Sequence, residues 1–145
     1  MDARKFLKSQ DISFKKNIEL LKAKEDVTKL LYADFLEEDN VNLRFVKLGL
    51  VYSYYVELIA FLLYNSLNIQ DCKSAGQVFS KLNNSYLSSV DYKVRNSIQH
   101  LDFRIENGML YCKNLQNKEH LTKKELELLL NKTIKIYEDL KKELV

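Results

Sequence analysis

The chain contains no proline and only three glycines among its 145 residues. Proline and glycine are the residues that most often interrupt helices and form turns, so their scarcity predicts long, uninterrupted helices. Leucine, lysine, glutamate and asparagine are abundant, a composition that also favours helix. A chain of this length corresponds to a single domain that can bury its own core. We therefore expect residues 1–145 to form one all-α domain.

The spacing of apolar residues predicts two long helices in the first half of the chain. The first begins at residue 11 or 13 and reaches about residue 38, with a bend near residues 24–26. Asn40 is a suitable N-cap and predicts a second helix over residues 41–67. That helix is apolar almost all round in its later part, so we expect it at the centre of a bundle.

The apolar segment at residues 48–64 is the stretch that most resembles a membrane span. Several polar or partly polar side chains interrupt it: Tyr52, Ser53, Tyr54, Tyr55 and Glu57. The segment also falls short of the ~20 clean apolar residues that a spanning helix needs. A buried helix of a bundle explains it better, and we expect no membrane partner.

The second half of the chain begins with two shorter helices in this interpretation. One is a surface helix over residues 74–87, and the other covers residues 90–101. The apolar period then changes to that of strands, and residues 103–106 and 109–112 flank an Asn-Gly dipeptide. Asn-Gly is the strongest short-range signal for a hairpin, because both residues accept the positive φ of a type I′ turn.

The last predicted element is a long helix that begins at Thr122, where Thr122 and Glu125 form a capping box. His120 lies just before it and is expected in a surface loop. The predicted fold is therefore a helical bundle of about five helices with a short β-hairpin before the last helix.

Charge and cysteine content point to no metal and no cofactor. The formal net charge of +3 is mild, so it tolerates an anionic partner without predicting one. Cys72 and Cys112 match no metal-ligand or redox spacing and are expected to be free thiols in a reducing compartment. Residues 1–10 are polar and lack the apolar core of a secretory signal. We expect a cytoplasmic protein.

The candidate functional motif is the sequence Arg-Asn-Ser-Ile-Gln-His at residues 95–100. It brings together one of four arginines and one of two histidines near the end of a predicted helix. Arginine holds a phosphate in a fixed fork of donors, and histidine exchanges protons near neutral pH. Together these residue types suggest chemistry on a phosphodiester.

The motif resembles the signature of the HEPN superfamily. In that signature a polar residue follows an arginine, and a histidine lies four to six residues beyond the arginine, the positions of Arg95, Asn96 and His100. Residues 101–108 also look like many prokaryotic members. The resemblance implies an all-α bundle, a homodimer and, in active members, a metal-independent endoribonuclease. Many such enzymes are toxins or act in antiviral defence.

An alternative within the same family is a non-catalytic module. Some members have lost activity and bind or scaffold other proteins. For this chain the alternative partner is a protein such as a nucleotidyltransferase antitoxin. A third interpretation is a helical protein with no nucleic-acid role, in which the arginine–histidine spacing is accidental.

Metal-free RNA cleavage assigns a role to each residue of the motif. The 2′-hydroxyl attacks the neighbouring phosphorus, so His100 is the expected general acid or base and Arg95 neutralises the developing charge. Asn96 either orients the substrate or is a plain helix-surface residue. Arg95 and His100 point roughly 140° apart on an ideal helix. Two copies meeting across a two-fold axis would pool both pairs in one groove.

Each candidate also has a structural explanation. Arg95 can pair with Asp91 one turn earlier, as a solvated ion pair. His100 can be a helix-terminal residue whose charge suits the helix dipole. Glu57 lies in an apolar helix and needs a partner when buried, for which Arg95 is a candidate. The tyrosines at 54–55 can stack on bases, although packing in the core or a dimer interface is the simpler interpretation.

Overall fold

The computed structural model describes residues 11–67, 91–112 and 120–144. These ranges contain four helices and a small sheet, in the order α2 (Asp11–Glu37), α3 (Val41–Leu67), α5 (Tyr92–Gln99), β1 (Phe103–Glu106), β2 (Met109–Cys112), β3 (His120–Thr122) and α6 (Lys123–Leu144). The predicted helical bundle with a hairpin before the last helix is confirmed in this form. Four helices are described instead of about five, because the helix expected over 74–87 lies outside the described residues.

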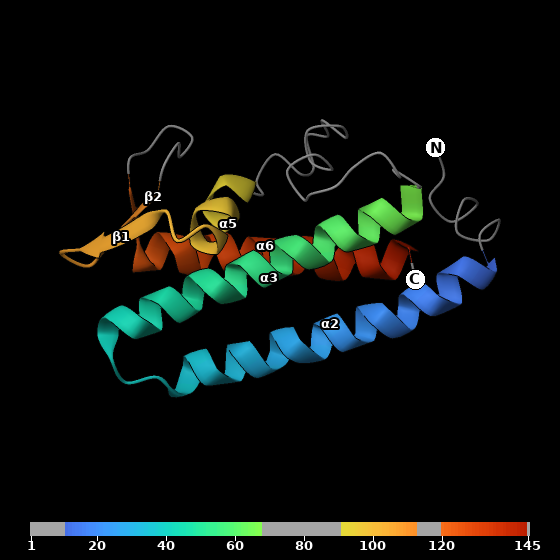
Figure 1. Cartoon of the computed structure of the whole chain (residues 1–145), viewed down its shortest axis with the longest axis horizontal. Coiled ribbons are helices and arrows are strands. Elements are labelled where there is room, and N and C mark those ends of the chain that lie inside the picture. The colour runs from blue at the N-terminus through green and yellow to red at the C-terminus, as the bar shows by residue number, and fades with distance from the viewer. Residues whose placement is uncertain (1–10, 68–90, 113–119, 145) are drawn as a thin grey trace.

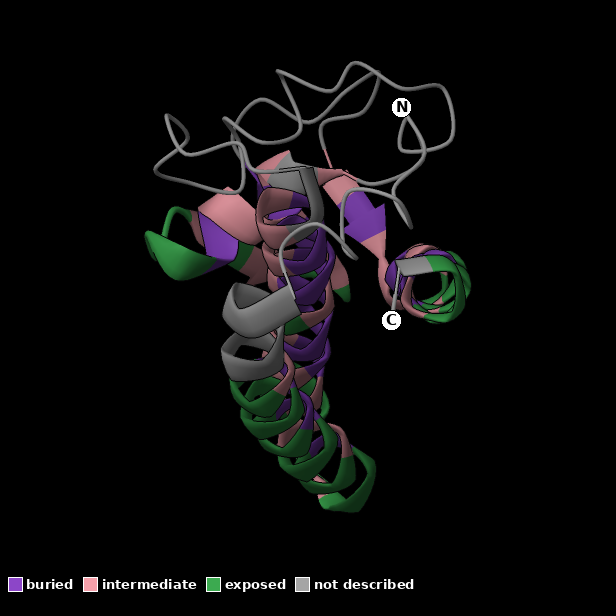
Figure 2. Ribbon diagram, turned by 90° about the vertical axis from the view of Figure 1, so that its right-hand side faces the viewer, coloured by how far each residue is buried: buried purple, intermediate pink, exposed green. Residues whose placement is uncertain are grey.

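Helix α3 is the centre of the bundle, as its apolar composition predicted. It packs against α2, α5 and α6, and Figure 1 shows α2 running antiparallel along one side of it while α6 crosses behind. Its fully buried side chains include Leu48, Val51, Tyr52, Val56 and Ile59. Figure 2 shows that buried residues concentrate along α3, whereas α2 is exposed along its outer side.

The segment Val41–Asn65 of α3 is long and apolar enough to cross a membrane, judged by length and composition alone. In the folded chain, 61% of its most apolar stretch is buried inside the protein. The core helix of a soluble bundle has the same length and composition, so these properties do not by themselves assign the helix to a membrane.

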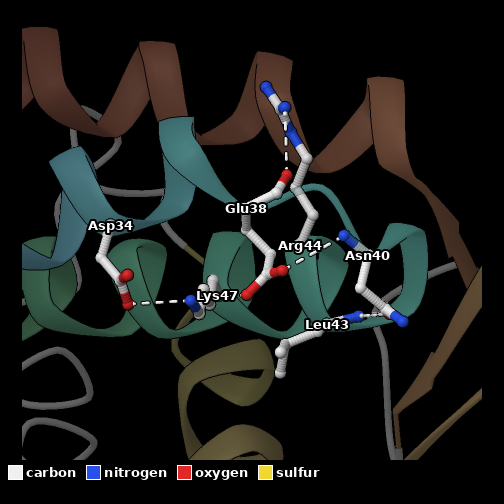
Figure 3. A network of polar contacts seen from close by, with 6 residues as sticks. All are labelled: Asp34, Glu38, Asn40, Leu43, Arg44 and Lys47. Carbon is white, nitrogen blue, oxygen red and sulfur yellow. Dashed lines mark hydrogen bonds and ion pairs between the residues drawn. The ribbon is translucent and has the colours of Figure 1, made fainter.

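The turn between α2 and α3 is held by a polar network that Figure 3 shows. Asn40 caps α3 as predicted, because its side-chain oxygen accepts a hydrogen bond from the Leu43 amide at 2.9 Å. The Lys47 ammonium lies 2.7 Å from the Glu38 carboxylate and 3.0 Å from that of Asp34. These contacts connect the end of α2 to the first turns of α3 and support their antiparallel packing.

The sheet combines the predicted hairpin with a third strand. Asn107 and Gly108 have φ values of 51° and 71°, as the type I′ turn requires. Strand β2 also pairs antiparallel with β3, so the strand order is β1-β2-β3. The placement of His120 in a loop is therefore wrong: it lies in β3, opposite Tyr111. A three-residue strand has too few positions to show an alternating pattern, and only its pairing with β2 defines it.

The predicted capping box at the start of α6 is confirmed. The Glu125 amide donates to the Thr122 hydroxyl at 3.1 Å, and the Thr122 amide donates to the Glu125 carboxylate at 3.3 Å. Two backbone amides that the helix itself cannot satisfy are thus paired. Local sequence alone determines this helix start.

A carboxylate of α2 faces α6 inside the bundle. Glu25 is buried, accepts a hydrogen bond from the Tyr137 hydroxyl and lies 2.7 Å from the Lys141 ammonium. Burial by itself raises the pKa of Glu25, but the hydrogen bonds from Lys141 and Tyr137 more than offset it, so that the pKa is lowered from the ordinary value of 4.5. The ionised form of Glu25 therefore connects two helices that flank α3.

This lowered pKa predicts how stability depends on pH. A carboxyl whose pKa is lower in the folded than in the unfolded state stabilises the fold above the unfolded value. That contribution is lost as the pH falls below about 4.5 and through the folded value. We expect urea unfolding followed by circular dichroism to show a shallower loss of stability over this acidic range in Glu25→Gln than in the wild type. Equal slopes would contradict the assignment.

Helix α5 ends in an unusual C-terminal turn. The Asp102 amide donates to the Ser97 carbonyl at 2.8 Å and the Leu101 amide to that of Ile98 at 3.2 Å, the hydrogen bonds of a Schellman motif. Leu101 occupies the left-handed position with a φ of 56°, where glycine is the usual residue. Its side chain is 81% exposed. The backbone is thus strained directly after His100, without compensating burial of the leucine.

Replacing this leucine should stabilise the protein. The left-handed conformation costs a residue other than glycine about 1–2 kcal/mol. Glycine removes this strain, but its greater flexibility in the unfolded chain offsets part of the gain in stability. We expect Leu101→Gly to raise the free energy of unfolding by about 0.5–1 kcal/mol. The matched control Leu128→Gly, at an exposed leucine inside α6, should lower it by about 1 kcal/mol. A destabilised Leu101→Gly variant in a urea titration would contradict the strain.

Candidate functional site

Helix α5, which carries the candidate motif, is fixed on α3 by close packing and by a buried tyrosine. Val94 and Ile98 are buried, and a Cβ on Gly49 of α3 would lie 2.8 Å from the Cδ1 atom of Ile98. Glycine at this position therefore permits the close approach of the two helices. The Tyr52 hydroxyl accepts a hydrogen bond from the Asp91 amide at 2.8 Å and lies 3.1 Å from the Asp91 carbonyl oxygen, to which it can donate.

Asp91 begins α5 and is not the partner of Arg95. Its carboxylate accepts a hydrogen bond from the Lys93 amide at 3.0 Å, which makes it the N-cap. Burial raises its pKa, although hydrogen bonds from the Lys93 and Val94 amides oppose the increase. The alternative in which Arg95 pairs with Asp91 one turn earlier is therefore not observed, because the cap directs the carboxylate to the start of the helix.

Arg95 instead pairs with Glu57 of α3. One terminal guanidinium nitrogen forms an ion pair with the Glu57 carboxylate, and the other donates to the side-chain oxygen of Asn96 at 2.6 Å. The Arg95 side chain is only 12% exposed and that of Glu57 is 38% exposed. The pairing suggested for Glu57 from sequence is thus observed, and two neighbours restrict the orientation of the guanidinium.

His100 stands at the other end of the motif, in the opposite environment. It is the C-cap of α5 and is exposed to solvent. Its backbone amide donates to the Asn96 carbonyl at 3.0 Å. The structure thus holds Arg95 against α3 and exposes His100 to solvent at the end of the helix.

A cavity of about 470 Å³ opens beside Arg95, between α2, α3 and α5. Its walls are residues 23, 24, 27 and 28 of α2, residues 54, 57 and 58 of α3, and Arg95 and Gln99 of α5. Among the described residues, the lining includes two cations, Lys24 and Arg95, and one carboxylate, that of Glu57. Among the described residues, His100 is not part of the lining of this cavity.

The two adjacent tyrosines of α3 differ in their surroundings. Tyr54 is exposed and lines the cavity. Tyr55 is half-buried, and its ring meets that of Tyr137 edge-on at 6.0 Å between centroids, a core contact. Of the pair, Tyr54 alone borders the cavity, and the packing interpretation holds for Tyr55.

Among residues 11–67, 91–112 and 120–144, no group of three or more histidine, cysteine, aspartate or glutamate side chains has the arrangement of a metal site. Cys112 is a free, buried thiol, and burial raises its pKa to about 11. A thiol with so high a pKa is protonated at neutral pH and is a poor nucleophile.

Sequence reasoning missed Tyr52 and Gly49, which position α5, and Lys24 and Gln99, which line the cavity. Tyr52 reads as one more aromatic residue of an apolar helix, and Gly49 reads as a weak helix former. The roles of Tyr52 and Gly49 depend on contacts with α5, which lies about 40 residues further along the chain, and nothing in the nearby sequence indicates these contacts.

Comparison of the chain with protein-family models, with curated proteins and with solved structures finds no match. The arrangement of the residues themselves therefore has to carry any functional argument.

The Arg95–Glu57 pair should show measurable coupling in a double-mutant cycle. We expect Glu57→Gln and Arg95→Met each to destabilise the fold, and the double variant to lose less than the sum, with a coupling of about 0.5–1.5 kcal/mol because Glu57 is partly screened by solvent. The Lys123–Glu127 pair, 3.9 Å apart with both side chains more than 40% exposed, serves as the control and should show a coupling near zero. Equal coupling in the two cycles, measured by urea unfolding, would contradict a special role for Glu57.

Proposed function

We propose that this protein is a cytoplasmic, metal-independent endoribonuclease of HEPN type that acts as a homodimer on single-stranded or loop RNA, as a toxin or antiviral-defence effector. The observation that carries the proposal is the contrast within one short helix. Arg95 is held in place by Glu57 and Asn96, while His100 is exposed at the helix end. A fixed cation and an accessible proton-transfer group are what phosphodiester cleavage needs.

The residues take distinct roles in this reaction. His100 removes the proton of the RNA 2′-hydroxyl or donates one to the departing 5′-oxygen. The 2′-oxygen attacks the adjacent phosphorus, which yields a 2′,3′-cyclic phosphate and a 5′-hydroxyl. Arg95 neutralises the charge that builds up on the phosphoryl oxygens. Asn96 and Glu57 orient the guanidinium, and Asp91 fixes the start of the helix that carries it.

The directions of these side chains support the homodimer that we propose. Arg95 borders a cavity whose lining does not include His100, and positions five residues apart point roughly 140° from each other on a helix. Two copies related by a two-fold axis would place the histidine of each protomer near the arginine of the other. Such an arrangement makes a single groove with two cations and two proton-transfer groups.

A second candidate function is a non-catalytic module that binds a protein partner such as a nucleotidyltransferase antitoxin. The observation that favours it is an apolar stripe on α2, in which Leu20, Val27 and Leu30 are exposed. Residues at this spacing lie on one side of a helix. An exposed apolar stripe of this kind is typical of surfaces that bind other proteins.

The test is cleavage of a labelled single-stranded RNA in EDTA. We expect the wild type to cleave and to leave 2′,3′-cyclic phosphate ends. His100→Ala should lower the rate by about 10²–10⁴-fold, and Arg95→Ala by about 10²–10³-fold. The control Lys132→Ala removes an exposed cation of α6 and should leave the rate unchanged.

Two outcomes separate the candidate functions. Loss of cleavage in both motif variants, with a dimeric wild type by light scattering, supports the nuclease. A folded, dimeric wild type that cleaves none of a varied set of RNAs contradicts it and favours the protein-binding module. In that case Leu30→Glu should abolish partner capture while His100→Ala leaves it intact.

A further inference from the structure

The three-stranded sheet has two faces of opposite character. Phe103, Ile105, Leu110, Cys112 and Leu121 belong to the face that packs on the protein core. Successive residues of a strand point to opposite faces, so Arg104, Tyr111 and His120 share the other face. The strand register places these three residues directly opposite one another, in a single row across β1, β2 and β3.

The three side chains of this row stack on one another. The Arg104 guanidinium lies over the Tyr111 ring, 4.4 Å from its centroid. The His120 ring lies 5.4 Å from the Tyr111 ring, tilted by 45°. A cation held over an aromatic ring in this way is attracted by the negative face of the ring. Tyr111, braced by His120, thus positions the guanidinium of Arg104.

Arg104 keeps most of its surface open to a ligand. Its side chain is 63% exposed. Within the part of the chain that the structure describes, its ion-pair contact is from Nε to the Glu106 carboxylate at 3.5 Å, and the Glu106 side chain is itself 59% exposed. A guanidinium has five N–H donors, so the terminal nitrogens are available to phosphate oxygens. The face of the guanidinium that is turned away from Tyr111 is a flat surface of the kind on which bases stack.

The row also lies close to the proposed catalytic histidine. Arg104 lies four positions after His100, so their Cα atoms are at most about 14 Å apart. Figure 1 shows the sheet at the end of the bundle, next to α5. A single strand of RNA that reaches His100 can therefore reach the row within a few nucleotides.

We propose that Arg104, positioned by Tyr111 and His120, is a binding site for single-stranded RNA outside the cleavage site. One base of the strand stacks on the outer face of the guanidinium, and the terminal nitrogens contact a neighbouring phosphate. Glu106 competes for the same cation and keeps the site weak in the absence of RNA. The inference rests on the proposed function and names a second surface through which the same substrate is held.

The test measures binding of a labelled single-stranded oligoribonucleotide in the His100→Ala background, so that cleavage plays no part. Fluorescence anisotropy compares the intact oligonucleotide with an abasic one of the same length. Because base stacking on a protein side chain contributes about 1–3 kcal/mol, we expect Arg104→Lys to weaken binding of the intact strand roughly 5- to 100-fold. Lysine keeps the charge and loses the flat face, so binding of the abasic strand should hardly change.

Variants of the neighbours separate positioning from folding. Tyr111→Phe keeps the ring and should bind as the parent does, whereas Tyr111→Leu should lose the preference for the intact strand. Glu106→Gln should tighten RNA binding about two- to three-fold, because it removes a negative charge that competes with the RNA phosphates for the Arg104 guanidinium at an exposed site. Lys132→Gln, on α6, is the control for loss of an unrelated cation. Thermal unfolding checks that each variant remains folded.

The outcomes for the row and for the nuclease are distinguishable. If the wild type cleaves RNA but Arg104→Lys binds both strands as its parent does, the proposed binding site at Arg104 is contradicted and the proposed nuclease is not. If the wild type binds RNA without cleaving it, and Arg104→Lys loses the preference for the intact over the abasic strand, the binding site at Arg104 is supported and the nuclease is contradicted. If folded His100→Ala has no affinity for either strand, the proposed binding site at Arg104 is contradicted.

Discussion

The burial of α3 on three sides is the constraint on which the rest of the described structure depends. Helices α2, α5 and α6 all pack against it, and among the described residues it contributes more buried side chains to the core than any other element. A helix so apolar cannot remain in water at low cost, since each large buried side chain contributes about 1.5–3 kcal/mol. The surrounding elements are placed by the need to cover it.

The position of the candidate site follows from that packing. Gly49 lets α5 approach α3 closely, and the Tyr52 hydroxyl holds Asp91, the N-cap of α5. With α5 in this position, Arg95 reaches the one carboxylate in the middle of α3, that of Glu57. A guanidinium that is mostly buried needs such a counter-charge. The orientation of Arg95 is thus a consequence of helix packing and not of the motif alone.

Elements governed by near neighbours in sequence could be predicted, and those governed by distant contacts could not. The Asn40 cap, the capping box at Thr122 and the Asn107–Gly108 turn follow from residues within a few positions of one another. The strand at His120 escaped prediction because its hydrogen bonds come from β2. In the candidate site, sequence identified Arg95 and its possible partner Glu57, but it left open a pair with Asp91, whose carboxylate caps the helix instead.

The sequence by itself determined a mostly helical domain with one hairpin, a central helix, and a motif that joins an arginine to a histidine. These properties follow from the lack of helix breakers, from apolar periodicity and from capping residues, all of which act over short stretches of chain. Only the tertiary structure decided which carboxylate meets Arg95, that His100 is exposed while Arg95 is not, and that Arg104, Tyr111 and His120 form one row. Each of these depends on side chains from separate elements, and their distances are set by how the helices and strands pack around α3.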